Sequence, residues 1–303
     1  MSIKDLNESF SISGCVNIVG GKGDLPVIEV SNSSATAKIS LYGGQVLSYV
    51  PAAKHELLFL SELAYYEKGK AIKGGIPVCW PWFGQDPEAK GRPAHGFARY
   101  KMWQLNAAEK ISDEKTKVTL TLSDDAETKN LWPYEFNLSL EVVVGETLEV
   151  KLISKNISGK PFVVTQALHT YFSVKDVSKV EIVGLDGAAY LDKAKSNTGE
   201  ENRLQEGNVS FNQEVDRIYL KAPNKLSIFE NEQTSTEAFS VGNKTCVVWN
   251  PWKELCEASA DLKPDDYKRF VCVETTNAGD DVVTIKPGEE YQISASYKSV
   301  VLS

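Results

Sequence analysis

The sequence is poor in the residues that build metal clusters and disulfide frameworks. It has three histidines and five cysteines among 303 residues. No Cys-x-x-Cys, HxH or HExxH motif occurs, and the cysteines are scattered at positions 15, 79, 246, 256 and 272. Spacing therefore gives no support for a metal site or cofactor. An odd number of scattered cysteines favours a reducing compartment, and we expect a cytoplasmic protein.

The sequence also lacks long apolar runs and an excess of basic residues. No run approaches the roughly 20 apolar residues that span a membrane, and the opening MSIKDLNESF has no basic segment followed by an apolar run. The net charge is −8 and the basic residues form no stripe. We therefore expect a monomer with neither nucleic acid nor membrane as partner. An anionic small molecule could bind only where a few cations gather locally.

Period-two alternation of apolar and polar residues dominates the chain. It is clear at residues 118–122, 136–142 and 148–152, and Gly145-Glu146 between the last two predicts an antiparallel hairpin. Further strands are expected at 27–30, 37–41, 46–50, 162–168 and 291–297, short helical turns at 61–67 and 264–267, and surface loops at 184–207 and 231–237. The pattern predicts an all-β fold, a large antiparallel β-sandwich in which residues 1–303 form a single domain.

The segment from residue 73 to residue 99, KGGIPVCWPWFGQDPEAKGRPAHGFAR, suits neither a regular helix nor a regular strand. Its prolines and glycines specify a bent backbone, with Trp80 and Trp82 on either side of a proline. Such a loop could be a core plug with solvated charges, or it could direct polar side chains at one spot. The polar side chains concerned are Lys73, Gln85, His95 and Arg99.

Three further residues with useful chemistry lie beside predicted strands. A histidine that closes a strand, such as His169, is more often structural than catalytic. A carboxylate after an apolar run, such as Glu274, can be a hydrogen-bonded anchor or a partly desolvated base. Asp216 is followed by Arg217, and a cross-strand ion pair is the ordinary fate of such residues. The remaining histidine, His55, is expected at the surface.

Six motifs run through the chain in a fixed order. KGGIPVCWPWFG and HGFAR lie in the 73–99 segment, and TQALHTYF, DRIY, VVWNPW and VCVETTNA follow downstream. In sequence and order they resemble the aldose 1-epimerase family, and within it the hexose-6-phosphate mutarotases, also called glucose-6-phosphate 1-epimerases. The resemblance spans nearly the whole chain and implies a galactose-mutarotase-like supersandwich.

The resemblance also implies an activity and a set of site residues. It implies interconversion of the α and β anomers of a hexose 6-phosphate, glucose 6-phosphate first among them, without a cofactor. His169 matches the family's general acid and Glu274 its general base, while His95 and Asp216 match residues that bind sugar hydroxyls. Gln85 is a further candidate for substrate binding, and the motif cations Lys73 and Arg99 are the candidates for the 6-phosphate.

One position departs from the family pattern. Phosphohexose mutarotases usually carry arginine before GGIP, whereas this chain has Lys73. Lysine offers a point charge in place of a bidentate fork, so attraction for phosphate is kept and geometry is loosened. Lys70 and Lys68 are further candidates for contacts with the 6-phosphate, outside Lys73 and Arg99. Three alternatives stay open: an aldose 1-epimerase of unphosphorylated sugars, a non-catalytic sugar-binding sandwich and, more remotely, a carboxylate-pair glycosidase.

Overall fold

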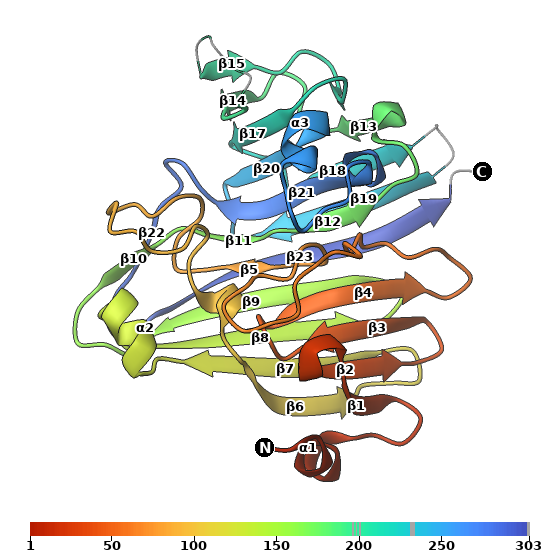
Figure 1. Cartoon of the computed structure of the whole chain (residues 1–303), viewed down its shortest axis with the longest axis vertical. Coiled ribbons are helices and arrows are strands. Elements are labelled where there is room, and N and C mark those ends of the chain that lie inside the picture. Colours follow the sequence, from red (N-terminus) through yellow and green to blue (C-terminus); the bar gives the residue numbers. More distant parts are fainter. Residues whose placement is uncertain (196, 198, 200, 231–233, 302–303) are drawn as a thin grey trace.

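The computed structural model describes residues 1–195, 197, 199, 201–230 and 234–301, and its strands form two large sheets and two smaller ones (Figure 1). All pairings between the named strands are antiparallel. Among these residues no helix is long and apolar enough to cross a membrane. The predicted all-β antiparallel architecture is confirmed.

The largest sheet carries the hairpin expected around Gly145. Along its strands the buried and partly exposed residues alternate, as the period-two pattern predicted, because one face lies on the core. In the described part of the chain this nine-stranded sheet has the order β16 (Val209–Ser210), β13 (Val180–Val183), β18 (Lys225–Glu230), β19 (Thr234–Val241), β23 (Glu290–Val301), β9 (Leu148–Asn156), β8 (Phe136–Val144), β7 (Thr116–Ser123) and β6 (Gln104–Lys110).

The second large sheet has at its centre a strand, β21, that is buried at every position. Val271 and Val273 on one of its faces join the main hydrophobic core, while Cys272 on the other face packs in a separate cluster with Phe270. The order of this sheet, over the residues described, is β15 (Asn202–Leu204), β14 (Ala189–Asp192), β17 (Val215–Leu220), β20 (Thr245–Asn250), β21 (Phe270–Asn277), β11 (Gln166–Leu168) and β5 (Val78–Cys79), and β12 (Tyr171–Ser173) also pairs with β21.

Two smaller sheets and short helices complete the structure. The sheets are β1 (Val16–Gly20), β2 (Pro26–Ser31), β3 (Ala35–Ser40) and β4 (Gln45–Pro51), and the pair β10 (Phe162–Val164) and β22 (Val283–Ile285). The α-helices are α1 (Ile3–Phe10), α2 (Ala126–Leu131) and α3 (Trp252–Glu257), and the 3₁₀ turns are η1 (Lys22–Asp24), η2 (Ala98–Tyr100), η3 (Val177–Lys179) and η4 (Asp266–Arg269).

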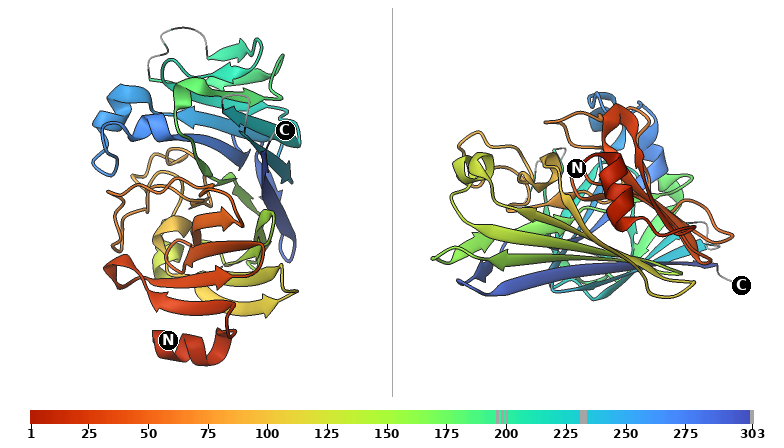
Figure 2. Two further views of the ribbon diagram at one scale, coloured as in Figure 1. Left: turned by 90° about the vertical axis from the view of Figure 1, so that its right-hand side faces the viewer. Right: turned by 90° about the horizontal axis from the view of Figure 1, so that it is seen from below.

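The core lies between facing layers. In the right-hand view of Figure 2, the long yellow-green and dark blue strands form one layer, and the red and orange N-terminal elements lie above it. One cluster of buried apolar side chains extends from Leu6 to Tyr297 and includes residues of both large sheets. Burial of this surface stabilises the fold without a disulfide, and all five cysteines are free and buried.

Several local expectations were wrong. Residues 61–67 contain a turn at 62–63 and no helix. The 184–207 stretch, expected as a surface excursion, contains strands β14 and β15, and β15 is exposed at all three of its positions. Strand β19 begins at residue 234, within the 231–237 stretch that was also expected at the surface. Residues 196, 198, 200 and 231–233 lie outside the described residues. The predicted strand 162–168 divides at Thr165, whose amide donates to the Pro81 carbonyl. The helical turn expected at 264–267 is present as η4, displaced to Asp266–Arg269.

Candidate functional site

The 73–99 segment is fixed to the sheets by close backbone approaches. Gly75 and Gly96 have positive φ angles of 64° and 71°. A Cβ atom at Gly75 would lie 2.2 Å from the Val46 carbonyl oxygen, and one at Gly96 would lie 2.0 Å from the Trp80 carbonyl oxygen. Only glycine fits these positions. The glycines that punctuate the sequence therefore serve to bring this loop against the scaffold.

The tryptophans hold the loop from below. Trp80 is fully buried, and its ring packs against Phe97, Trp132 and Phe136. Trp82 donates its indole N–H to the Pro93 carbonyl at 3.0 Å. The two tryptophans are therefore buried in the core, as the core-plug interpretation expects. The polar side chains of the segment, Lys73, Gln85, His95 and Arg99, line a cavity.

A cavity of about 720 Å³ opens over the eight-stranded sheet. Aromatic side chains that the sequence reasoning did not place in the site, Phe83 and Tyr171 among them, supply part of its wall. Each of the site residues expected from the sequence lines this cavity: Lys73, Gln85, His95, Arg99, His169, Asp216 and Glu274. The structure therefore brings together side chains from four separate segments of the chain.

His169 and Glu274 form the floor. Glu274 lies on β21, and His169 lies at the bend between β11 and β12, both of which pair with β21. The His169 Nδ1 atom is 3.4 Å from Glu274 Oε1, and the two residues are 7% and 2% exposed. His169 Nδ1 and Glu274 Oε2 are buried and have no hydrogen-bond partner. Unpartnered buried polar atoms destabilise a fold, so they are a feature that binding of a polar ligand would relieve.

Burial dominates the protonation of this pair. It lowers the pKa of His169 well below its usual range, and His95, Arg99 and Lys73 lower it further. Burial raises the pKa of Glu274 well above its usual range, Asp216 adds to this effect, and Arg99 opposes it. Both shifts favour neutral imidazole beside protonated carboxyl. The charged pair, imidazolium with carboxylate, and the neutral pair, imidazole with carboxyl, differ only in which of the two groups carries one proton.

His95 and Asp216 line the same cavity as His169 and Glu274. The His95 Nδ1 atom accepts the Gly84 amide at 3.3 Å, which leaves Nε2 as the donor of the neutral ring. Burial is the main cause that lowers the pKa of His95, to about 3, so this ring is neutral at physiological pH. Burial likewise raises the pKa of Asp216 to about 6. These groups can offer one donor and one acceptor to a hydroxylated ligand.

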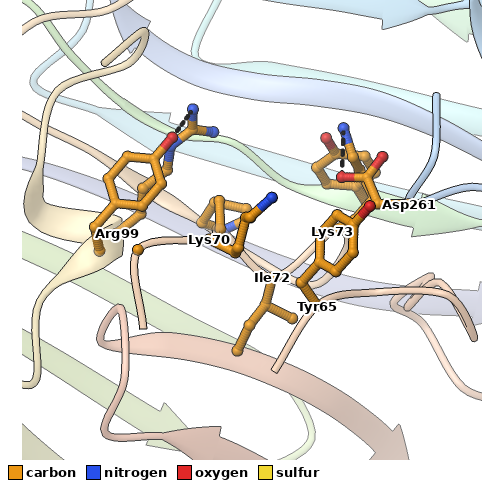
Figure 3. Close-up of a pocket in the computed structure, with 11 residues that line it drawn as sticks. Tyr65, Lys70, Ile72, Lys73, Arg99 and Asp261 are labelled. Carbon is orange, nitrogen blue, oxygen red and sulfur yellow. Dashed lines mark hydrogen bonds and ion pairs between the residues drawn. The ribbon is translucent and has the colours of Figure 1, made fainter. Parts of the chain in front are cut away.

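A smaller cavity of about 240 Å³ adjoins the first and shares Lys73, Arg99 and Tyr171 with it. Figure 3 shows Lys70 beside these residues and Lys73 paired with Asp261; the Lys73 Nζ to Asp261 Oδ2 distance is 3.5 Å. No motif in the sequence pointed to Asp261, which arrives from the loop after α3. Lys73 and Arg99 both line the two cavities, and part of the Lys73 charge is balanced by Asp261.

Arg99 differs from Lys73 in its partners. Its Nη2 atom donates to the Ala94 carbonyl at 2.8 Å and to the Tyr100 hydroxyl at 3.0 Å. Its Nε atom is buried without a hydrogen-bond partner. No acidic side chain in the described structure forms an ion pair with Arg99. Arg99 is a positioned guanidinium with donor capacity to spare.

Comparison with known proteins agrees with this geometry. The profile of the family described as aldose 1-epimerase matches residues 26–298. A protein of Escherichia coli strain K12, provisionally named glucose-6-phosphate 1-epimerase, is 39% identical over 260 residues, or 85% of each chain. One of Cenchrus ciliaris with the same provisional name is 38% identical over 266 residues, which cover 84% of this chain and 79% of that one.

Solved structures show the same similarity in three dimensions. A crystal structure of a provisionally identified mutarotase from Salmonella typhimurium superposes with a TM-score of 0.88 at 30% identity, covering 97% of this chain and 96% of the other. The predicted supersandwich is thereby confirmed. Sequence motifs, fold and family profile agree over nearly all of the chain. The chain belongs to the aldose 1-epimerase family.

Proposed function

We propose that the protein is a hexose-6-phosphate mutarotase that interconverts the α and β anomers of glucose 6-phosphate. The observation that carries this proposal is the buried His169–Glu274 pair, with two unpartnered polar atoms, beside a cavity that Lys73 and Arg99 also line. The names of the curated relatives support the same substrate.

The chemistry assigns one proton transfer to each member of the pair. Glu274 takes the proton from O1 while His169 gives a proton to the ring oxygen O5, and the C1–O5 bond breaks to leave an aldehyde. Rotation about C1–C2 then presents the other face of the aldehyde. Return of the two protons closes the ring to the opposite anomer. General acid–base catalysis of this kind typically contributes roughly 10² to 10⁴ in rate.

The protonation states that burial favours for His169 and Glu274 agree with this cycle. Ring opening converts a carboxylate and an imidazolium into a carboxyl and a neutral imidazole, the state that burial favours. The buried pair therefore stabilises the protonation state of the open-chain complex. A bound sugar, by hydrogen bonding to the charged groups, restores the state that starts the reaction. Neither step needs a proton from bulk water.

The remaining cavity residues bind the substrate. His95 donates from Nε2 to a sugar hydroxyl, Asp216 accepts from another, and Gln85 at the exposed rim contacts the far side of the ring. Arg99 and Lys73 hold the 6-phosphate, and Lys70, which lines the adjoining cavity, makes a further contact with it. Lys68 lines neither cavity and is not assigned a role.

The organisation of the molecule is part of the proposal. We propose that residues 1–303 form one domain, supported by the apolar cluster from Leu6 to Tyr297. We also propose that the protein works as a monomer, because one chain by itself supplies every side chain to which the proposed reaction assigns a role. The five free, buried cysteines fit a reducing compartment such as the cytoplasm.

NMR exchange spectroscopy at chemical equilibrium tests the function. The rate of exchange between the two anomeric protons is measured for glucose 6-phosphate and for glucose, each with and without protein. We expect the protein to accelerate exchange of glucose 6-phosphate well above buffer and to act much more weakly on glucose. Equal acceleration would favour an aldose 1-epimerase without phosphate specificity. Binding without acceleration would favour a non-catalytic sugar-binding protein.

A further inference from the structure

Cys272 lies beneath the catalytic pair and has no part in the proposed reaction. It is two residues before Glu274 on β21, so both side chains point to the same face of the strand. One ligand atom each from His169, Cys272 and Glu274 lies within 4.8 Å of the other two, and all three residues are buried. A nitrogen, a sulfur and a carboxylate oxygen therefore converge on one point.

Two of these groups have polar atoms that nothing satisfies. His169 Nδ1 and Glu274 Oε2 are buried without a hydrogen-bond partner in the resting cleft. A sugar can satisfy them during turnover. When no sugar is bound, any ligand that accepts electron pairs from imidazole and carboxylate gains the same interactions.

We propose that His169, Cys272 and Glu274 form an inhibitory binding site for a thiophilic divalent cation, with Zn²⁺ as the best fit. Imidazole, thiolate and carboxylate are the three ligand types that Zn²⁺ takes in proteins, and three protein ligands leave a fourth position for water. Binding displaces two protons to water, one from the Cys272 thiol and one from the Glu274 carboxyl, while the neutral His169 ring binds through a nitrogen lone pair. The ion then occupies the groups that would exchange protons with the sugar.

The distances permit this with small movements. The three ligand atoms lie within 4.8 Å of one another, so an ion placed between them would lie at most about 2.8 Å from each, against about 2.0 to 2.3 Å for Zn²⁺ bonds to these atoms. Side-chain movements of at most about 0.5 to 0.8 Å close the difference. Arg99 and Lys73 repel a cation here and so limit its affinity. Sugar and metal need the same atoms of His169 and Glu274, and they therefore exclude each other.

The test compares two cysteine variants. Cys272→Ala removes the proposed ligand. Cys246→Ala is the matched control, because Cys246 lies on the neighbouring strand β20, opposite Thr275, and is also buried. It packs in the main core, whereas Cys272 packs in the separate cluster that contains Phe270. We expect Zn²⁺ to inhibit the wild type and a chelator to restore activity. Loss of an outer-sphere partner alone typically weakens metal binding about 10- to 100-fold, so Cys272→Ala should need at least tenfold more Zn²⁺, and Cys246→Ala the same amount as wild type.

A second measurement does not depend on activity. Co²⁺ bound through a thiolate gives a sulfur-to-metal charge-transfer absorption, which should appear in the wild type and in Cys246→Ala and disappear in Cys272→Ala. If circular dichroism shows that Cys272→Ala is unfolded, Cys272→Ser takes its place. Equal inhibition of wild type and the Cys272 variant overturns the proposal. So does a wild-type cobalt complex without the thiolate band.

Discussion

Removal of the Arg99 guanidinium should lower the activity on phosphorylated sugars and leave the activity on unphosphorylated sugars nearly unchanged. Arg99 has a buried Nε atom without a partner, and its Nη2 atom is held by Ala94 and Tyr100. Hydrogen bonds to charged groups contribute about 1.5 to 3 kcal/mol, and each 1.4 kcal/mol is tenfold. Loss of one such bond to phosphate in Arg99→Ala should therefore lower kcat/KM for glucose 6-phosphate roughly 10- to 100-fold. Lys73 cannot compensate in full because Asp261 is paired with it.

The assay is anomer exchange by NMR with both sugars, and two further variants sharpen it. Arg99→Lys keeps a charge and should fall between wild type and Arg99→Ala for glucose 6-phosphate. Tyr100→Phe removes the hydrogen bond to Arg99 without removing the cation, so it should change activity only slightly. Exchange of unphosphorylated glucose should hardly respond to any of these changes. An equal loss for both sugars, or no loss for either, would refute the phosphate role of Arg99.

Three further predictions concern stability. The pKa of Asp216 is raised to about 6 in the folded protein, so its ionisation lowers the free energy of unfolding as the pH rises from about 4 to about 6. At pH 8 Asp216→Asn should therefore have a free energy of unfolding up to about 3 kcal/mol above that of the wild type, measured by denaturant unfolding. At pH 4 this difference should disappear. Gly96→Ala, whose Cβ would meet the Trp80 carbonyl, should lower Tm far more than Gly91→Ala, where φ is equally positive (78°) but nothing lies within 4 Å; equal losses would mean that backbone conformation alone decides. Calorimetry should give one cooperative transition for residues 1–303, and two separate transitions would contradict a single domain.

The strands were predictable because alternation reports directly on burial. In β8, Phe136, Leu138 and Leu140 are buried and the residues between them are more exposed, so the period-two pattern gives both the strand and its face. The helices α1 and α2 escaped because they are short, eight and six residues, and are signalled mainly by capping residues such as Ser2 and Asp125. Periodicity needs more residues than a single turn or two provides.

The site was predictable only through motifs. Composition and spacing alone left His169 and Glu274 as ordinary strand-end residues, and their contact arises because two strands pair with the same third strand. The Lys73–Asp261 ion pair could not be read from spacing, because its members lie far apart in the sequence. Neither could the contact of His169 with Cys272 and Glu274, since His169 lies about a hundred residues before them. Such contacts depend on register and loop placement, which local patterns do not encode.

Anomer exchange in Glu274→Gln tests the central claim most directly. The substitution keeps the size of the side chain and removes the carboxylate that we propose accepts the O1 proton, while binding of glucose 6-phosphate can be checked by calorimetry. We expect the catalysed exchange to fall by a factor on the order of 10² or more with binding retained. Near-normal exchange in a folded Glu274→Gln variant would contradict the acid–base account of this site.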